Sequence, residues 1–479
     1  MISAELAKKI NIVCLLAAMA AVLILPLSKQ VWYDETVSML CSKGFSHDSP
    51  TLFANTTTVS SATLAQMNTL ENVYKATILD NGNSFVYNVK LHYFTMLFGN
   101  SLGVYMLFSK LCAIAALLAF TWLCRMVFKD SIFTAVAIIL FAADLTFIGM
   151  SHEIRAYELA TCFVTLAAVF FYKFMYEDER PLYLFLLGIF SVGAVLSHFL
   201  SVYVILVFLG YLVVRKKAGL FKPKNLAAIA IPVALVGIYL WFAFVGLQYM
   251  SHENEKFHAK AAVMPFSAMH VLYRSMAMGA IDFKAVFPAF GEKKVAVVVS
   301  FLLVIGLYIS ALKGASTKEE KKNLNLLAIL GISGTVFLAA LCLKSQHYTA
   351  MYNRYHSFCI PFASLFIAYA LYLLFRSDRM NKVIKAGAMA VFMVPCCGLF
   401  MLAAKKRSTN VEYNHITVAQ EIVRDHVDKI ELPTWDDAFL LQSVLPNGYK
   451  IDYVLNVSSR YFTLYKAGTA VQVPLIRKN

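Results

Sequence analysis

Long apolar runs alternate with short polar segments along most of this chain of 479 residues. About eleven runs approach the roughly 20 residues that a helix needs to cross a bilayer. The polar pair Ser197-His198 divides one longer apolar stretch into two short helices. The pattern therefore predicts an all-α polytopic membrane protein, with spans near residues 10–28, 103–123, 131–150, 156–174, 182–197, 199–214, 225–247, 295–312, 324–343, 357–375 and 386–403.

Two polar stretches interrupt this pattern and define the predicted domains. Residues 1–403 form a transmembrane domain, in which the large loop 29–102 separates the first two spans. Residues 404–479 form a small C-terminal domain. We expect this domain to be α/β, with strands at Ala438–Ser443 and Tyr449–Asn456 and a helix at Thr417–Asp428.

Composition supports the membrane prediction, because 59% of the residues are hydrophobic and only 15% are charged. Soluble domains are usually about 45–50% apolar. The net charge of +15 does not indicate a nucleic-acid partner, because the basic residues come in small groups in alternate loops. Basic residues in short loops mark the cytoplasmic side of a membrane protein. We therefore expect a multi-pass protein of the bacterial cytoplasmic (inner) membrane, with a cytoplasmic N-terminus and with loop 29–102 and the C-terminus outside.

Several classes of site are not indicated. The nine cysteines lie mostly in or beside apolar runs, with no CxxC pair and no zinc spacing. The chain has no P-loop, no dinucleotide fingerprint, no GxSxG and no HExxH. Polar side chains at the membrane edge are therefore the candidates for chemistry.

Two adjacent carboxylates, Asp34 and Glu35, follow the first apolar run at the head of the large outer loop. A carboxylate in this place can accept a proton from a hydroxyl nucleophile. It can also hold a divalent metal such as Mg or Mn against a phosphate. The structural alternative is that Asp34 only caps a short helix and Glu35 only places a favourable charge in its first turn.

A second polar cluster lies between two apolar runs at the same outer face. It contains His152, Glu153, Arg155 and Tyr157 in one short turn. An arginine at the entrance of a helix can bind a phosphate in a bidentate manner. Snorkelling of the arginine to the interface is the simpler explanation, but it does not account for so many polar groups in one turn.

Three further segments place polar residues at the predicted outer face. Lys90 and His92 end the first loop, and His198 separates two short helices. Arg354 and Tyr355 begin a late helix, where Arg354 is a second candidate for contact with a phosphate. Each residue alone has a structural explanation. Ionisable residues collected at one membrane face nevertheless indicate a functional site.

These residues resemble the GT-C membrane glycosyltransferases, and most closely the branch that contains protein O-mannosyltransferases and lipid A aminoarabinose transferases. The resemblance covers roughly residues 1–215, and in the rest of the chain only Arg354-Tyr355 match beyond the general layout. The segments that carry it are Trp32-Tyr33-Asp34-Glu35, Tyr87–Phe98, Glu153-Ile154-Arg155-Ala156-Tyr157, Ser197-His198-Phe199 and Asn353-Arg354-Tyr355.

The resemblance implies an enzyme at the outer face that uses a sugar linked to polyprenyl phosphate. Asp34 would be the catalytic carboxylate, Glu35 is a second catalytic candidate, and Arg155 would lie near the donor phosphate. His152, Lys90, His92 and Arg354 would assist at the phosphate, and Glu153, Tyr157, His198 and Tyr355 are further site candidates. His92 falls where the family often has His-Pro-Pro, but this chain lacks the prolines. Some relatives use a divalent metal at the carboxylate and others do not.

The predicted function is transfer of a sugar from a polyprenyl-phosphate donor to lipid A, a polysaccharide or a protein. The residues do not decide which sugar or which acceptor is used. A transporter or lipid flippase for envelope glycoconjugates is the main alternative, and it predicts ionisable residues near mid-helix and paired broken helices. A non-catalytic assembly or sensor protein is a third reading, which predicts little effect when Asp34 is lost.

Overall fold

The computed structural model describes most of the chain, with several gaps. Trp32, the stretch 46–56 of the first loop and nearly all of the predicted outer loop 248–294 lie outside the described residues. The described ranges are 3–24, 33–45, 57–80, 82–129, 131–220, 222–239, 293–345, 353–378, 381–405, 415–432, 435–446, 449–456, 461–466 and 469–474.

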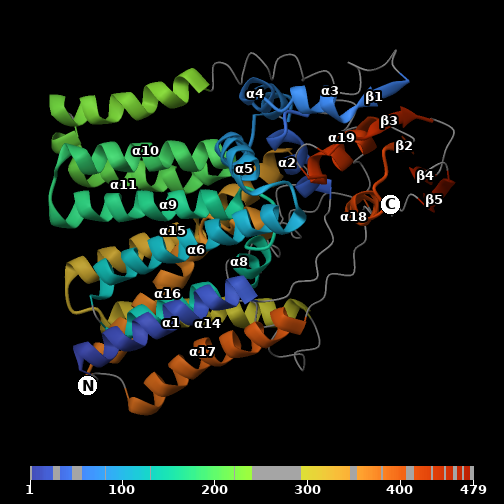
Figure 1. The fold of residues 1–479 in the computed structure, drawn as a ribbon. Coiled ribbons are helices and arrows are strands. Elements are labelled where there is room, and N and C mark those ends of the chain that lie inside the picture. The colour runs from blue at the N-terminus through green and yellow to red at the C-terminus, as the bar shows by residue number, and fades with distance from the viewer. Residues whose placement is uncertain are drawn as a thin grey trace.

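A bundle of long helices forms one part of the molecule, and a small sheet with short helices gathers at one end of it (Figure 1). Within the described residues, four helices are long and apolar enough to cross a membrane, and shorter apolar helices pack with them. This arrangement confirms the predicted class, a polytopic α-helical protein with a small α/β C-terminal domain. The bundle comprises α1 (Ala4–Ile24), α6 (Leu102–Phe128), α7 (Ile132–Ala142), α8 (Leu145–Met150), α9 (Tyr157–Tyr172), α10 (Pro181–Ser197), α11 (Val202–Leu220), a helix at Pro223–Tyr239, α14 (Lys293–Gly314), α15 (Lys318–Ser345), α16 (Ile360–Arg376) and α17 (Lys382–Lys405).

Two long apolar runs are interrupted at polar residues, one of them within a single predicted span. The run 131–150 is divided into α7 and α8 at Asp144, whose carboxylate accepts hydrogen bonds from the backbone N–H groups of Thr146 at 2.8 Å and Phe147 at 3.1 Å. This is a helix N-cap, which satisfies donors that have no partner within the helix. His198 separates α10 from the short helix η3 (Phe199–Ser201) that leads into α11, as the sequence predicted.

The first loop folds into short helices at one end of the bundle. They are α2 (Tyr33–Ser42), α3 (Ser61–Gln66), α4 (Leu70–Leu79) and α5 (Phe85–Phe98). Gly44 follows α2 with a φ of +80°, and a Cβ there would lie only 2.5 Å from the carbonyl oxygen of Met67. Glycine is therefore required at the turn that ends α2.

The C-terminal domain contains a five-stranded sheet in the order β1-β3-β2-β4-β5. Its edge strand β1 comes from the first loop and pairs antiparallel with β3, with Thr58 opposite Val454. Strand β2 pairs with β3 on one side, where the two run parallel, and with β4 on the other side, where they run antiparallel. The strands are β1 (Thr58–Ser60), β2 (Lys429–Leu432), β3 (Asp452–Leu455), β4 (Tyr461–Lys466) and β5 (Thr469–Pro474), with helices α18 (His415–Arg424) and α19 (Trp435–Val444).

One strand predicted in this domain is wrong. Residues Ala438–Ser443 lie within the helix α19, whereas the predictions at Tyr449–Asn456 and Thr417–Asp428 are confirmed by β3 and α18. A short apolar run does not by itself distinguish a buried strand from a buried helix. Here α19 packs one side against the sheet and another against α2, so that Ala438, Phe439 and Leu441 are all buried.

The C-terminal domain is joined to the first loop through a common core. The ring of Phe439 stacks on Phe45 with centroids 4.9 Å apart. Tyr105 donates its hydroxyl hydrogen to the carbonyl oxygen of Ser443 at 2.7 Å, and the Asn100 amide donates to that of Leu445 at 3.1 Å. The boundary after residue 403 stays a prediction, but the described residues on its two sides form one packed unit.

Lys43 is buried at this junction, with only 2% of its surface exposed. Its ammonium group donates to Thr95 Oγ1 at 2.9 Å and to Asn100 Oδ1 at 2.6 Å. Burial lowers the pKa of Lys43 from 10.5 to about 8. Between pH 8 and pH 10.5, Lys43 is therefore protonated to a greater extent in the unfolded chain than in the folded chain.

Replacement of Lys43 by methionine tests this buried charge. The folded protein carries the cost of burying the ammonium below pH 8, and the cost falls as pH rises toward 10.5, by at most about 1.4 kcal/mol per pH unit. The melting temperature of the wild type should therefore rise relative to that of Lys43→Met between pH 8 and pH 10. Thermal unfolding of both proteins in detergent at several pH values measures this, and a constant difference would contradict the assignment.

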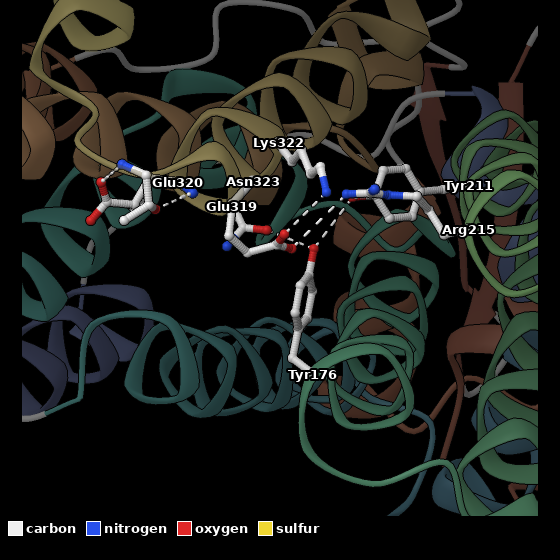
Figure 2. Close-up of polar contacts among 8 residues, drawn as sticks. Tyr176, Tyr211, Arg215, Glu319, Glu320, Lys322 and Asn323 are labelled. Carbon is white, nitrogen blue, oxygen red and sulfur yellow. Dashed lines mark hydrogen bonds and ion pairs between the residues drawn. The ribbon is translucent and has the colours of Figure 1, made fainter.

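The opposite end of the bundle carries a separate polar network (Figure 2). Tyr176 donates to Asn323 Oδ1 at 2.6 Å, and Arg215 lies 4.0 Å from the Glu319 carboxylate. Tyr176 belongs to a π-helical turn, Lys173–Glu177, that follows α9. The basic loops that the sequence assigns to the cytoplasm therefore meet at one end, far from the sheet.

Candidate active site

Three segments that are distant in the sequence meet beside the first turn of α2. The Asp34 carboxylate lies 3.3 Å from the guanidinium of Arg354, measured from Oδ2 to Nη1. Arg354 belongs to the short helix η5 (Asn353–His356), and Arg155 comes from the turn between α8 and α9. The Asp34 side chain is 26% exposed and that of Arg354 is 18% exposed, so a ligand can reach this ion pair from solvent.

Arg155 fixes the beginning of α2. Its Nη1 donates to the backbone carbonyl oxygen of Asp34 at 2.8 Å and to Ser38 Oγ at 3.1 Å. Ser38 lies one helical turn after Asp34, on the same face of α2. The turn at 151–156 thereby determines where the Asp34 carboxylate lies.

Glu35, in α2, makes a second connection to the turn that contains Arg155. It is 1% exposed, and its Oε1 accepts a hydrogen bond from the backbone N–H of Ile154 at 2.8 Å. A buried carboxylate hydrogen-bonded to backbone holds two segments together. Arg155 and Glu35 therefore connect α2 to the turn before α9 in both directions.

A group of packed aromatic rings lies beside the two arginines. The His198 ring lies 4.9 Å from that of Tyr157, 5.0 Å from Phe358 and 5.9 Å from Tyr355, between ring centroids. Burial and the charges of Arg155 and Arg354 lower the pKa of His198 to about 3. His198 is thus neutral at pH 7, and because its Nδ1 accepts from Leu200 N at 3.3 Å, its hydrogen lies on Nε2.

Both arginines keep their charge at this site. Burial works against the charge of Arg155, but Tyr157, Asp34 and Asp80 more than offset it and hold the pKa above its ordinary value. The pKa of Arg354 is raised in the same manner, with burial opposed by Tyr157, Tyr355 and Asp34. Arg155 and Arg354 therefore stay charged beside the carboxylates of Asp34 and Asp80, and a guanidinium group is suited to bind a phosphate.

Several predicted site residues lie elsewhere in contacts of their own. Lys90 is exposed on α5 over the ring of Phe163, 5.8 Å from its centroid. His92 is buried with its Nδ1 3.0 Å from the carbonyl oxygen of Ser42, near the far end of α2. The pKa of His92 is lowered, first by burial and also by Lys43. In the part of the chain that the structure describes, no hydrogen bond or ion pair joins Lys90 or His92 to Asp34.

His152 and Glu153 lie in the same turn as Arg155 but differ in exposure. His152 is buried, with its Nδ1 2.8 Å from Ser151 Oγ and 2.9 Å from the carbonyl oxygen of Ile148. Glu153 is half-buried. His152 therefore packs against the end of α8.

Two contributors to the site were not predicted. Ser38 could have been found from its spacing of four residues from Asp34 on a predicted helix. Asp80, at the end of α4, supports the charge on Arg155 from a part of the first loop that has no motif. Its position depends on the folding of the loop, so no local pattern indicates it.

The metal prediction does not fit the donors around Asp34. Its carboxylate faces the cation of Arg354, and Glu35 is engaged with the backbone of the turn. Within the described residues, no group of three or more His, Cys, Asp or Glu side chains could hold a metal ion. Divalent cations need several oxygen ligands, whereas here the Asp34 carboxylate is paired with the guanidinium of Arg354.

Comparison with solved structures gives matches of low similarity. The oligosaccharyltransferase of Archaeoglobus fulgidus, crystallised with Zn and sulfate, matches 76% of this chain at 14% identity and a TM-score of 0.37. The chain spans 53% of the length of that structure. ArnT from Cupriavidus metallidurans bound to undecaprenyl phosphate matches 92% of this chain and 85% of its own, at 12% identity and a TM-score of 0.38. At such scores no residue role is transferred from either structure.

Comparison with families gives a clearer match over part of the chain. None of the curated proteins compared matches the chain in sequence. Residues 83–243 match the family model described as dolichyl-phosphate-mannose-protein mannosyltransferase. This segment includes Arg155, Tyr157 and His198 but neither Asp34 nor Arg354. The resemblance predicted from the sequence is thereby confirmed for roughly a third of the chain, which is similar to these protein mannosyltransferases.

Proposed function

We propose that this chain is a membrane glycosyltransferase that takes a sugar from a polyprenyl-phosphate-linked donor. The observation that carries the proposal is the meeting of Asp34, Arg155 and Arg354 from three distant segments at one end of the bundle. The family match over residues 83–243, which contains Arg155, supports it independently. The acceptor would be lipid A, a polysaccharide or a protein outside the cytoplasmic membrane.

The arginines would bind the donor phosphate. When the bond between the anomeric carbon and the phosphate oxygen breaks, the polyprenyl phosphate leaves with an additional negative charge. Arg354 would exchange its ion pair with Asp34 for this phosphate, while Arg155 holds α2 in place and adds its charge. Preorganised cations in a poorly hydrated site stabilise such developing charge well.

Asp34 would act as the general base. The acceptor hydroxyl oxygen forms the new bond to the anomeric carbon, its proton passes to the Asp34 carboxylate, and the phosphate departs from the opposite face. The product therefore has inverted anomeric configuration. Withdrawal of Arg354 toward the phosphate would free the carboxylate for this step, which couples donor binding to activation of the acceptor.

The remaining site residues would position these groups. Glu35 is proposed as a positioning residue rather than a second base, because its carboxylate is buried against Ile154 N. Half-buried Tyr355 would contact the sugar or the phosphate, and the buried rings of His198 and Tyr157 would support it. Arg354 and Arg155 would supply to the phosphate the positive charge that a divalent metal supplies in other enzymes, so we expect a reaction that needs no divalent metal.

The test is release of polyprenyl phosphate from a labelled donor. Purified protein in detergent is incubated with a panel of polyprenyl-phosphate sugars and a crude envelope acceptor, with and without a chelator. We expect release from at least one donor, dependent on acceptor and unchanged by the chelator. Loss of release in the chelator, restored by Mg²⁺ or Mn²⁺, would overturn the metal-independent mechanism.

Failure to release lipid phosphate from every donor would favour the transporter or flippase. In that case the protein reconstituted in vesicles should move a labelled lipid-linked sugar between leaflets without cleaving it. Within the described residues, Asp34, Arg155 and Arg354 lie at one end of the bundle rather than along it, which favours transfer chemistry over transport.

A further inference from the structure

A cavity with basic walls lies at the end of the bundle opposite the candidate active site. It has a volume of about 600 Å³ and is formed where α14 ends, α15 begins and α16 ends. Its polar lining residues are Lys313, Lys321 and Ser377, and its apolar ones include Ile309 and Leu312. The helix α15 has 28 residues, which corresponds to about 40 Å, and η5 with Arg354 packs near its other end. The cavity is therefore not part of the Asp34 site.

The acidic residues nearest in sequence to this cavity are already neutralised. Glu320 Oε1 accepts from Arg376 at 2.8 Å, and its Oε2 accepts from the backbone N–H groups of Ser316 and Thr317 at 2.8 and 3.1 Å. Thr317 Oγ1 accepts in turn from Glu320 N, so the pair forms a capping box at the start of α15.

Glu319 is held away from the cavity by other cations. It lies 3.4 Å from Lys322 and 4.0 Å from Arg215, and Figure 2 shows its carboxylate directed toward these two side chains. Both network carboxylates thus have cationic partners other than the two lysines of the cavity. Asp378 follows Ser377 and is exposed, but it does not line the cavity. The cavity therefore presents the surplus positive charge of Lys313 and Lys321.

An apolar stripe leads along α14 to the same cavity. Val298, Leu302, Ile305 and Ile309 recur at spacings of three and four residues and are each more than a third exposed. Such spacing places them on one face of the helix. This face offers a hydrocarbon chain a path that ends beside the two lysines.

We propose that this cavity binds one anionic phospholipid, with its phosphate between Lys313 and Lys321 and an acyl chain along the α14 stripe. Ser377 lines the same cavity and supplies a hydroxyl for the headgroup. Basic pockets between membrane helices on the cytoplasmic side are suited to anionic headgroups, since the charge of that leaflet adds to the local contacts. The site is independent of the proposed sugar transfer.

Native mass spectrometry of the full chain tests the proposal. Protein in mixed micelles is titrated with phosphatidylglycerol, with phosphatidylcholine of the same chains, and with glycerol 3-phosphate. We expect one retained phosphatidylglycerol per chain, little phosphatidylcholine, and no competition by glycerol 3-phosphate at equal concentration. The double variant Lys313→Gln/Lys321→Gln should bind phosphatidylglycerol roughly tenfold or more weakly, as loss of two lysine–phosphate contacts predicts.

The matched control is Lys318→Gln/Lys382→Gln, which removes the same charge near the same end but outside the cavity lining. It should bind phosphatidylglycerol like the wild type, and thermal melts in detergent verify that both variants are folded. Equal weakening in both double variants would overturn the site in favour of a diffuse surface charge. Efficient competition by glycerol 3-phosphate would replace the lipid with a free anion, and equal retention of phosphatidylcholine would remove charge recognition.

Discussion

Replacement of Asp34 by asparagine is expected to lower the rate of sugar transfer by on the order of 10²- to 10⁴-fold, the usual contribution of a general base. Asparagine has almost the same shape and keeps an oxygen 3.3 Å from Arg354, but it cannot take a proton from the acceptor. The donor should still bind, so the loss should appear in kcat. Release of polyprenyl phosphate under saturating donor measures this.

The variant Glu35→Gln tests whether Glu35 acts as a general base or only positions α2. Glutamine keeps an oxygen that can accept the hydrogen bond from Ile154 N, so we expect less than a tenfold loss of rate. Asp425→Asn, which alters an exposed pair with Arg424 in the C-terminal domain, serves as a charge-matched control and should be fully active. If Glu35→Gln abolished transfer while Asp34→Asn did not, Glu35 would be the general base and Asp34 the positioning residue.

The second large effect is expected for Arg354→Gln. Removal of a group that stabilises the departing phosphate should cost roughly 10²- to 10³-fold in kcat/KM, by analogy with single donors to developing charge. Arg354→Lys should recover part of this loss, because it restores the charge but not the planar pair of donors. Steady-state kinetics with varied donor concentration measures both variants.

Arg376→Gln is the matched control for this arginine. Arg376 forms an ion pair of 2.8 Å with Glu320 at the opposite end of the bundle, so its loss tests whether any broken arginine pair lowers activity. We expect near-normal transfer from this variant. Equal losses in Arg354→Gln and Arg376→Gln would assign the effect to stability rather than to the phosphate.

The bundle could be predicted from the sequence because each span is a local pattern. Apolar runs predicted the long helices, and the pair Ser197-His198 predicted one break, whereas the break at Asp144 fell within a single predicted span. The sheet was only partly predictable, because its pairings are not local. Thr58 pairs with Val454 across nearly the whole chain, and nothing near either residue specifies the other. The helix α19 was mistaken for a strand because its apolar run is short.

The candidate site, like the fold, was predictable only in part. Topology brought Asp34, Arg155 and Arg354 to one face without specifying any contact between them. The direct pairing of Asp34 with Arg354, and the choice of Glu35 as the residue that binds Ile154 N, depend on how α2 is rotated. Lys90 and His92 were grouped with the site because they end the same loop, whereas α5 directs them to Phe163 and to the end of α2.

The placement of β1 in the C-terminal sheet also sets the order in which the protein matures. A ribosome releases the first loop, with Asp34 and Glu35, long before it synthesises β3, the strand with which β1 pairs. Domains generally form as units during synthesis, N-terminal parts first. Here β1 cannot pair until β3 has been synthesised, so the part of the first loop that contains β1 reaches its final place only late in synthesis.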